Sequence, residues 1–352
     1  MTSVPAVVLG ATGYVGGELL RLIATHPQFD LVAAVSESRA GEHISDTFPH
    51  LRSAFDDTLF AAHDTWLEKI PAGSPLALFS AAPHGASAAM IAKVLEQAKD
   101  RDLGVRVVDV SADFRYRDDT AYESVYGAEH GAPQLLGDFV CAVPEHLSGT
   151  DTRHVAHPGC FATAILLAAV PLLQSGLVSP ELFVTGITGS TGSGRTPQPG
   201  THHPERHSNL YAYKALSHRH APEIANLAEA ASGTRAGINF VPHSGPFARG
   251  IFASVQAKAT GEISAEQLRE SFATLYADAP FVRVVDGSPK LKNVVASNMA
   301  EVGIAVSGDT VVAMSAIDNL VKGAAGGAMQ WMNRLFGQPD TAGLTGIPPG
   351  WT

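Results

Sequence analysis

The amino-acid sequence predicts an α/β protein of two domains, a parallel-sheet domain followed by a domain of mixed α/β structure. Three observations carry this prediction. The chain has 352 residues, which is more than one domain usually contains. From Val4 to Val110, short apolar runs alternate with helical patterns, which is typical of a parallel sheet covered on both faces. After Cys160 the pattern changes to runs that alternate between apolar and polar residues.

The first domain begins with four apolar runs. A glycine-rich turn and a helical pattern follow the first run, and a polar stretch follows the second. A Pro-His-Gly turn and a helical stretch over residues 86–99 follow the third. We therefore predict strands of one parallel sheet at residues 4–9, 31–35, 76–80 and 105–110.

The second domain begins with a helix, predicted over residues 161–174. Alternating runs follow and predict strands at residues 183–188, 237–241, 250–259 and 310–316. The polar segment 189–220 is rich in Gly, Pro and His, and we expect it to be a long functional or mobile loop. A final helix is predicted from about residue 320 to residue 336.

Composition excludes several classes of protein. A formal net charge of −10 argues against a general nucleic-acid-binding surface. The two cysteines, Cys141 and Cys160, form no disulfide framework and suit a reducing compartment. The longest apolar stretch, residues 161–170, is too short to span a membrane, and the N-terminus has no basic region typical of a signal peptide. We expect a cytoplasmic protein with no membrane or nucleic-acid partner.

A glycine-rich turn follows the first strand and opens a helix. Its spacing is G-x-x-G-x-x-G, formed by Gly10, Gly13 and Gly16. Glycine lets the backbone approach a pyrophosphate, and a helix N-terminus offers free N–H groups to it. This position favours a dinucleotide site over an ordinary tight turn, with contacts from the glycines and from the intervening residues Thr12, Tyr14 and Val15.

The end of the second strand indicates which dinucleotide binds. An acidic residue usually holds the ribose hydroxyls of NAD at this place. Here Ser36, Ser38 and Arg39 can hold a 2′-phosphate, which favours NADP. Glu37 argues against NADP if its side chain points inward, and a solvated polar turn is the alternative for each single residue.

Cys160 is the candidate nucleophile. It follows a Pro-Gly break and stands where an apolar helix begins. A helix N-terminus lowers the pKa of a thiol and raises the fraction of thiolate. A small buried cysteine is the alternative, and Cys141, inside the apolar FVCAVPE, fits that alternative better.

The segment His218-Arg219-His220 supplies candidate partners for the thiol. Either imidazole can transfer protons near neutral pH, and the guanidinium can hold an anion. The helix expected next carries Glu223 in its first turn. Between residues 195 and 220 basic residues and histidines, Lys214 among them, greatly outnumber acids, which points to an anionic ligand such as a phosphate. No metal is expected, because no suitable cysteine or acidic ligands accompany the histidines.

Two further residues are candidates for ligand contacts. Arg115 follows the fourth strand, at the edge where open parallel sheets bind ligands, and can clamp a carboxylate or phosphate. Asn319 precedes the final helix and can hydrogen-bond a carboxamide. A helix N-cap is an equally good use of Asn319.

Taken together, these motifs resemble the N-acetyl-γ-glutamyl-phosphate reductase family of arginine biosynthesis. The match spans nearly the whole chain and rests on segments such as GATGYVGGELLRL, VDVSADFRYRD, HPGC, GSTGSGR, HRHAPEI and AIDNLVKGAAG. The resemblance implies a Rossmann NADP-binding domain over residues 1–159 and 319–352. It also implies an α+β catalytic and dimerisation domain over residues 160–318, like that of glyceraldehyde-3-phosphate and aspartate-semialdehyde dehydrogenases. A homodimer or homotetramer is expected from the family.

The resemblance also implies a mechanism. Cys160 attacks an acyl phosphate, the resulting thioester accepts a hydride from NADPH, and the thiohemiacetal releases the semialdehyde. His218 matches the family's catalytic histidine, and His220 is the second choice. The resemblance adds Pro83 to the residues expected to bind the cofactor. Those expected to bind substrate are Arg115, Ser190, Arg219 and Glu223.

Two alternatives stay open at this point. The segment 201–220 also looks like the sister enzyme of lysine biosynthesis, whose substrate is an aminoadipyl or glutamyl phosphate held on a small acidic carrier protein. A non-catalytic, NADP-sensing protein of the same fold is the other alternative. The motif at the nucleophile also departs from the family's usual pattern, because His157, Phe161 and Ala162 stand where Asn, Tyr and Pro are common.

Overall fold

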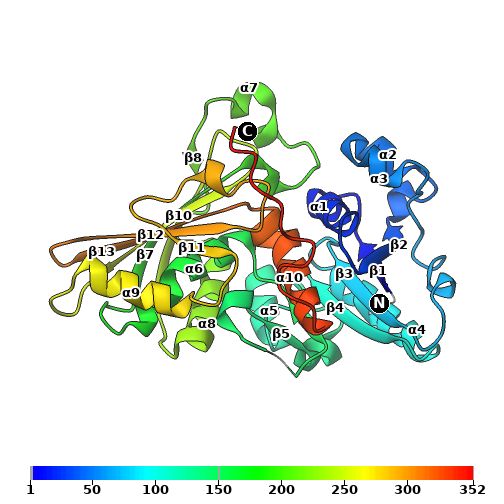
Figure 1. Cartoon of the computed structure of the whole chain (residues 1–352), viewed down its shortest axis with the longest axis horizontal. Helices are drawn as coiled ribbons and strands as arrows, with labels where there is room; N and C mark the ends of the chain where they lie inside the picture. The colour runs from blue at the N-terminus through cyan, green and yellow to red at the C-terminus, as the bar shows by residue number, and fades with distance from the viewer. Residues whose placement is uncertain (1–2, 150, 352) are drawn as a thin grey trace. The chain divides into compact units, whose positions relative to one another are not determined.

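A computed structural model describes residues 3–149 and 151–351 of the chain (Figure 1). It divides into two compact units, each of which is described by itself. The first comprises residues 1–142, 149–157 and 325–345, and the second comprises residues 143–148, 158–324 and 346–352. Relative to the expected domain boundaries, this division places residues 143–148, 158–159, 319–324 and 346–352 with the second unit.

The first unit is built on a six-stranded, fully parallel sheet in the order β2-β1-β3-β4-β6-β5. The four predicted strands are confirmed, within two residues at each end. Two further strands, β5 and β6, have only three residues each and carry no recognisable pattern. The bounds are β1 (Val4–Leu9), β2 (Phe29–Val35), β3 (Pro75–Ser80), β4 (Gly104–Asp109), β5 (Phe139–Cys141) and β6 (His154–Ala156).

Helices cover both faces of this sheet. Val7 and Leu9 of β1 pack in one apolar cluster with Ile91 and Val94 of α4 (Ser87–Lys99). Val8, which points to the opposite face, is also fully buried. On that side α1 (Tyr14–Ile23) packs against β1 and β2, and α10 (Gly326–Leu335) packs against α1 and β4. Shorter helices are α2 (Ile44–Thr47), α3 (Arg52–Phe55) and α5 (Asp119–Tyr126).

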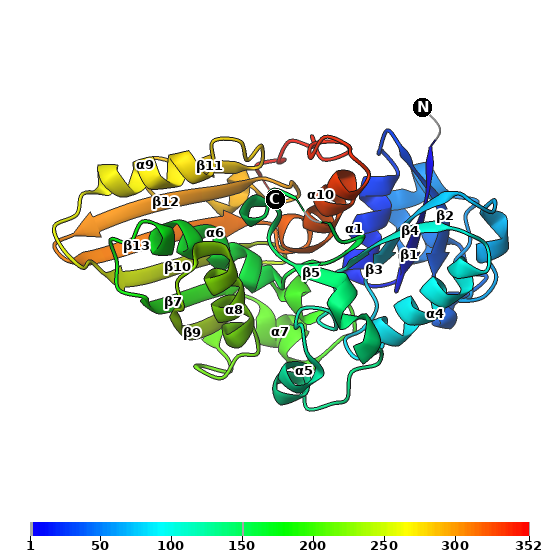
Figure 2. The same cartoon turned by 90° about the horizontal axis from the view of Figure 1, so that it is seen from below.

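The second unit contains a seven-stranded mixed sheet in the order β11-β12-β13-β10-β7-β9-β8. Figure 2 labels all of these strands except β8, which Figure 1 labels. The strands β7 and β9 pair in parallel, as do β11 and β12, and the other neighbours are antiparallel. The bounds are β7 (Glu181–Thr188), β8 (Tyr211–Ala212), β9 (Gly237–Ser244), β10 (Ile251–Lys258), β11 (Val282–Val284), β12 (Ala300–Ser307) and β13 (Thr310–Ile317).

One face of the mixed sheet is covered by α6 (Cys160–Gln174), α8 (His220–Ser232) and α9 (Ala265–Leu275). The helix α6 is apolar on every side and nearly every residue is buried, because it packs against β10 and β13 as well as against α8 and α9. This central helix begins at Cys160, so the packing of the unit fixes where the candidate nucleophile stands.

Two sequence predictions need correction. The segment 189–220 is not structureless, because it forms the 3₁₀ turns η6 (Ser190–Ser193) and η7 (Pro199–Thr201), the short helix α7 (His203–Arg206) and β8. The final helix does not run evenly from residue 320. It begins as a π-helical turn, η9 (Val321–Ala325), and becomes α-helical only at Gly326.

Candidate active site

Cys160 is the first residue of α6, and its side chain is half-buried. Glu223, from the first turn of α8, accepts a hydrogen bond from the N–H of Gly159 at 2.7 Å. The structure therefore places the thiol at the N-terminus of a buried helix, as the sequence predicts. Cys141 is also half-buried, in β5 of the first unit, where it packs against an apolar cluster.

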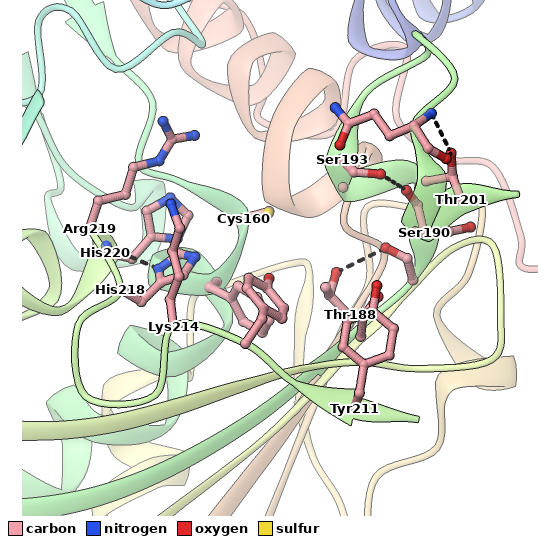
Figure 3. A pocket seen from close by; sticks show the side chains of 17 residues that line it. Cys160, Thr188, Ser190, Ser193, Thr201, Tyr211, Lys214, His218, Arg219 and His220 are labelled. Carbon is pink, nitrogen blue, oxygen red and sulfur yellow. Dashed lines mark hydrogen bonds between the residues drawn. The ribbon is translucent and has the colours of Figure 1, made fainter. Parts of the chain in front are cut away.

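Cys160 opens into a cavity of about 510 Å³ whose lining residues all belong to the second unit (Figure 3). In this view His218 and His220 lie on one side of the sulfur, and Ser190 and Ser193 lie on the other. The cavity thus brings together most of the predicted catalytic and substrate-binding residues of this unit. Those that line it are Cys160, Ser190, His218, Arg219 and His220.

The position of His218 defines its protonation state and its tautomer. Its Nδ1 accepts a hydrogen bond from the main-chain N–H of His220 at 3.2 Å, which leaves the proton of the neutral ring on Nε2. Burial, followed by the charges of Arg219 and Lys214, lowers the pKa of His218 to about 4. At neutral pH, His218 is therefore an uncharged hydrogen-bond donor through Nε2.

Cations and hydroxyls complete the lining of the cavity. Lys214 and Arg219 supply two positive charges, and no acidic side chain lines the cavity among the described residues. The backbone of Lys214 has a φ of 46°, in the left-handed region that a side-chain-bearing residue rarely adopts. Ser190 and Ser193 belong to the turn η6, where the hydroxyl of Ser193 donates to the carbonyl of Ser190 at 2.7 Å.

The cavity is also lined by residues that the sequence does not single out, Lys214 and Tyr213 among them. Lys214 is indicated only as part of the basic stretch, and no motif indicates Tyr213. Burial first, and the nearby Cys160 second, raise the pKa of Tyr213 well above its usual value, so its phenol stays protonated. In the sequence, only the position of Tyr213 within the basic segment that ends at HRH could have indicated it.

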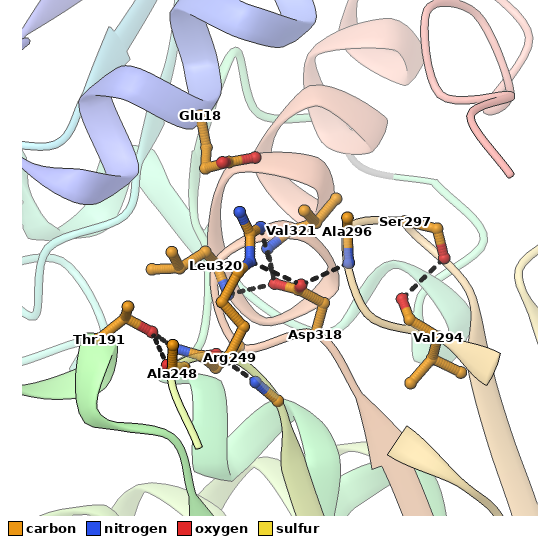
Figure 4. Close-up of polar contacts among 12 residues, drawn as sticks. Glu18, Thr191, Ala248, Arg249, Val294, Ala296, Ser297, Asp318, Leu320 and Val321 are labelled. Atoms are coloured by element: carbon orange, nitrogen blue, oxygen red, sulfur yellow. Dashed lines mark hydrogen bonds and ion pairs between the residues drawn. The ribbon is translucent and has the colours of Figure 1, made fainter. Parts of the chain in front are cut away.

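Glu223 and Asn319 are not among the residues that line the cavity, and both side chains bind neighbouring parts of the second unit. Their roles toward substrate and cofactor stay predictions. Glu223 is only 1% exposed and accepts a hydrogen bond from the N–H of Gly159, so it supports the turn before Cys160. Asn319 accepts from the N–H of Gly250 at 2.7 Å and donates to the hydroxyl of Thr191 at 3.0 Å. It is not a helix N-cap, because Asp318 accepts from the main-chain N–H groups of the first turn (Figure 4).

Arg115 belongs to the first unit and is nearly buried. Its Nε donates to the carbonyl of His157 at 3.2 Å, and its Nη2 donates to the carbonyl of Val110 at 2.9 Å. These bonds fix the guanidinium at the carboxyl end of β4. An anion-binding role for Arg115 stays a prediction.

The glycine turn of the first unit has the shape that a pyrophosphate needs. A Cβ on Gly10, whose φ is 68°, would lie 2.6 Å from the backbone of Ala81 and Ala82, and one on Gly16 would lie 2.5 Å from the carbonyl of Ala11. Gly13, the N-cap of α1, has nothing closer than 3.9 Å to such an atom. The turn is closed where it touches the sheet and open at the helix N-terminus, so the residues present fit a dinucleotide.

The segment after β2 lies at the same edge of the sheet as the glycine turn. Glu37 is exposed, and its carboxylate accepts the main-chain N–H of His63 at 2.6 Å. Arg39 is also exposed and pairs with Glu42 at 2.7 Å. The carboxylate of Glu37 is therefore engaged by the neighbouring loop, which removes the objection that this residue raised against NADP.

Two family models match the chain. The model of the semialdehyde dehydrogenase NAD-binding domain covers residues 5–148, and that of the semialdehyde dehydrogenase dimerisation domain covers residues 160–319.

Among the described residues, no helix is long and apolar enough to cross a membrane, and no three His, Cys, Asp or Glu side chains are grouped to hold a metal ion.

Curated relatives match over nearly their whole length. The chain is 41% identical to the N-acetyl-gamma-glutamyl-phosphate reductase of Symbiobacterium thermophilum, with 97% of each chain covered. It is 39% identical to the enzyme of the same name from Nitrosococcus oceani, with 97% of this chain and 98% of the relative covered. Neither name refers to a carrier protein, so the alternative of a carrier-bound substrate is not favoured.

Solved structures share the fold. Aspartate semialdehyde dehydrogenase II of Vibrio cholerae aligns with a TM-score of 0.67 at 16% identity, over 96% of this chain and 98% of the other. The aspartate semialdehyde dehydrogenase of Candida albicans, solved with NADP, aligns with a TM-score of 0.61 at 16% identity, over 96% and 99%. At this level of identity the likeness concerns the fold alone.

Proposed function

The chain belongs to the semialdehyde dehydrogenase family, and we propose that it is an N-acetyl-γ-glutamyl-phosphate reductase of arginine biosynthesis. The reaction is the NADPH-dependent reduction of N-acetyl-γ-glutamyl phosphate to N-acetyl-glutamate 5-semialdehyde and phosphate. The observation that carries the proposal is a cysteine at the N-terminus of a buried helix, opening into a cavity with two cations and a neutral imidazole.

The covalent steps take place on Cys160. Its thiolate attacks the acyl carbon, the bond from that carbon to the phosphate oxygen breaks, and a thioester forms. After reduction of the thioester, the tetrahedral thiohemiacetal carries its negative charge on oxygen. It then expels the thiolate and releases the aldehyde. The helix N-terminus favours the ionised sulfur at the start and at the end of this cycle.

His218 acts as a donor to the developing oxyanion. Because its pKa is lowered to about 4, the ring is neutral when the enzyme works, and Nε2 carries the proton. A donor fixed in this way stabilises the tetrahedral species more than the planar substrate. His220 lines the same cavity and fixes the His218 tautomer through its main-chain N–H.

Lys214, Arg219 and Ser190 bind the anionic groups of the substrate. N-acetyl-γ-glutamyl phosphate carries a carboxylate at one end and a phosphate at the other, and the cavity offers cations with no competing acid in its described lining. Arg115, at the end of β4, is a further predicted anion-binding residue. Glu223 contributes indirectly by holding the turn before Cys160.

The first unit holds NADPH, which supplies the hydride when bound. Gly10 and Gly16 let the turn pack against neighbouring backbone, and Gly13 leaves the helix N-terminus open to the pyrophosphate. Thr12, Tyr14 and Val15 flank that approach. Ser36, Ser38 and Arg39 hold the 2′-phosphate. Pro83 and Asn319 are the candidate residues for the nicotinamide end of the cofactor.

The protein is expected to be a cytoplasmic homo-oligomer. The helices of the second unit cover one face of its sheet, and Phe183 of β7 is exposed on the other face. The description of the matched family model as a dimerisation domain supports pairing through this unit. Replacing Phe183 with Asp should then reduce the mass measured by light scattering, and an unchanged mass would argue against pairing through this face.

The reverse reaction tests the proposed chemistry. The wild-type protein should oxidise N-acetyl-glutamate 5-semialdehyde with NADP only when phosphate is present. Cys160→Ser should abolish this oxidation and leave NADPH binding nearly intact, whereas the control Cys141→Ser should retain activity. Full activity of Cys160→Ser would defeat the proposal, and so would a requirement for a carrier-bound substrate in place of the free one.

A further inference from the structure

We propose that Gly323 is a positioning residue for the nucleophile. In this proposal the bare backbone of Gly323, in the π-helical turn η9, packs against Cys160 and fixes the direction in which its thiol points. The inference rests on the role of Cys160 proposed above, and it assigns a role to Gly323 in the segment AIDNLVKGAAG. Both residues belong to the second unit.

The contact leaves no room for a side chain at position 323. A Cβ on Gly323 would lie 2.8 Å from the Cβ of Cys160, 3.1 Å from its Cα and 3.2 Å from the Cδ1 of Ile317. Real Cβ atoms essentially never approach other atoms within 3.0 Å. Any residue other than glycine would therefore push against the backbone that carries the thiol.

The wide turn brings Gly323 to this place. The N–H of Gly323 donates to the carbonyl of Asp318 at 3.0 Å, five residues back, which is the hydrogen bond of a π-helix. Single π-helical turns are rare and occur frequently at functional sites. An ordinary α-helical turn would direct the backbone of position 323 elsewhere.

The start of the turn is fixed by Asp318, which is fully buried (Figure 4). Its carboxylate accepts from the N–H groups of Leu320 and Val321, each at 2.8 Å, and from that of Ala296 at 2.7 Å. Arg249 pairs with the same carboxylate at 3.0 Å. The turn therefore begins at a rigid point of the second unit.

Lys322 anchors the middle of the turn. Its ammonium lies 2.6 Å from the carboxylate of Glu145, and these side chains are 0% and 1% exposed. A buried ion pair tolerates little displacement, because separating two opposite charges in a medium of low dielectric constant costs much free energy. The side chain of Lys322 is thus held by Glu145, while the backbone of the next residue, Gly323, contacts Cys160.

Cys160 is consequently held from two directions. Glu223 fixes the N–H of Gly159 before it, and Gly323 limits the space beside its Cα and Cβ. A displacement of about 1 Å at a reacting atom can reduce the rate by about 10²-fold, so a small shift of Cys160 should be visible in kinetics.

The first test replaces Gly323 with Ala. The kcat of the phosphate-dependent oxidation should fall by about 10²-fold while the dissociation constant for NADPH stays unchanged. The pH midpoint of Cys160 alkylation by iodoacetamide should rise, because the sulfur leaves the helix N-terminus. The matched control is Gly261→Ala, at a position of the same unit where a Cβ meets open space. A wild-type kcat and alkylation profile for Gly323→Ala would overturn the proposal.

The second test is independent of the reaction. Cys160→Gly removes the Cβ that a side chain at position 323 would strike. The loss of melting temperature caused by Gly323→Ala should therefore be smaller in the Cys160→Gly background than in the wild type. Equal losses in both backgrounds would refute the contact. If Gly323→Ala does not fold alone, recovery of a folded double variant supports the proposal, and failure of both contradicts it.

Discussion

Removing one partner of the buried ion pair of Lys322 and Glu145 should strongly destabilise the second unit. Its members are 2.6 Å apart and 0% and 1% exposed, so water does not solvate either charge when the partner is removed. Lys322→Met keeps the length of the side chain and leaves the carboxylate of Glu145 buried without its cation. Breaking a buried pair in this way costs about 3–5 kcal/mol. We expect Lys322→Met to lower the free energy of unfolding by this amount.

The assay is denaturant unfolding followed by circular dichroism, with a matched control in the same unit. Lys258 lies 2.7 Å from Asp309, almost the same distance, but these side chains are 62% and 69% exposed. Lys258→Met should therefore change stability very little, because exposed pairs are solvated whether or not they are paired. A double variant, Lys322→Met with Glu145→Leu, should recover most of the loss, since no buried charge is left alone. Equal effects of Lys322→Met and Lys258→Met would refute the reasoning.

Three further predictions concern charge and protonation. His218→Gln, which keeps an N–H donor, should retain a higher kcat than His218→Ala. In the wild type, kcat should not change around pH 6.5 through His218, because the pKa of this ring is lowered to about 4. Burial raises the pKa of Asp109 to about 6, so ionisation of this carboxyl should destabilise the wild type as the pH rises from about 4 to 6. The melting temperature measured against pH should show this loss in the wild type and not in Asp109→Asn. Arg39→Ala should weaken NADPH binding about tenfold or more and leave NADH binding unchanged in fluorescence titrations, since a hydrogen bond to a charged group contributes about 1.5–3 kcal/mol.

The parallel sheet could be predicted from the sequence because its long strands are buried on both faces. Runs such as Val4–Leu9 need no partner to be recognised. The three-residue strands β5 and β6 could not be found in this way. They become strands because Val155 pairs with Val108 of β4 on one side and with Val140 on the other, and such pairing depends on the finished sheet.

The chemical groups of the site could also be predicted, because they lie in short motifs. Cys160 at a helix start and the pair His218 and His220 are local signals. The supporting contacts are not local. Nothing near Glu223 in sequence indicates that it holds Gly159, and nothing near Gly323 indicates that it faces Cys160. The left-handed backbone of Lys214 likewise reflects the course of the surrounding segment and not a preference of lysine.

The location of the cavity has a consequence for the order of the two half-reactions. The thiol, the neutral imidazole and the cations that line the cavity all belong to the second unit. The nucleophile and the proposed oxyanion donor for transfer of the acyl group from phosphate to Cys160 are among these groups, whereas reduction of the thioester requires the cofactor. In the proposed mechanism the acyl-enzyme should therefore form from the acyl phosphate without NADPH, with release of one phosphate per chain, and intact-protein mass spectrometry should detect it. Absence of the adduct, with normal turnover once NADPH is added, would show instead that acylation depends on groups outside this unit.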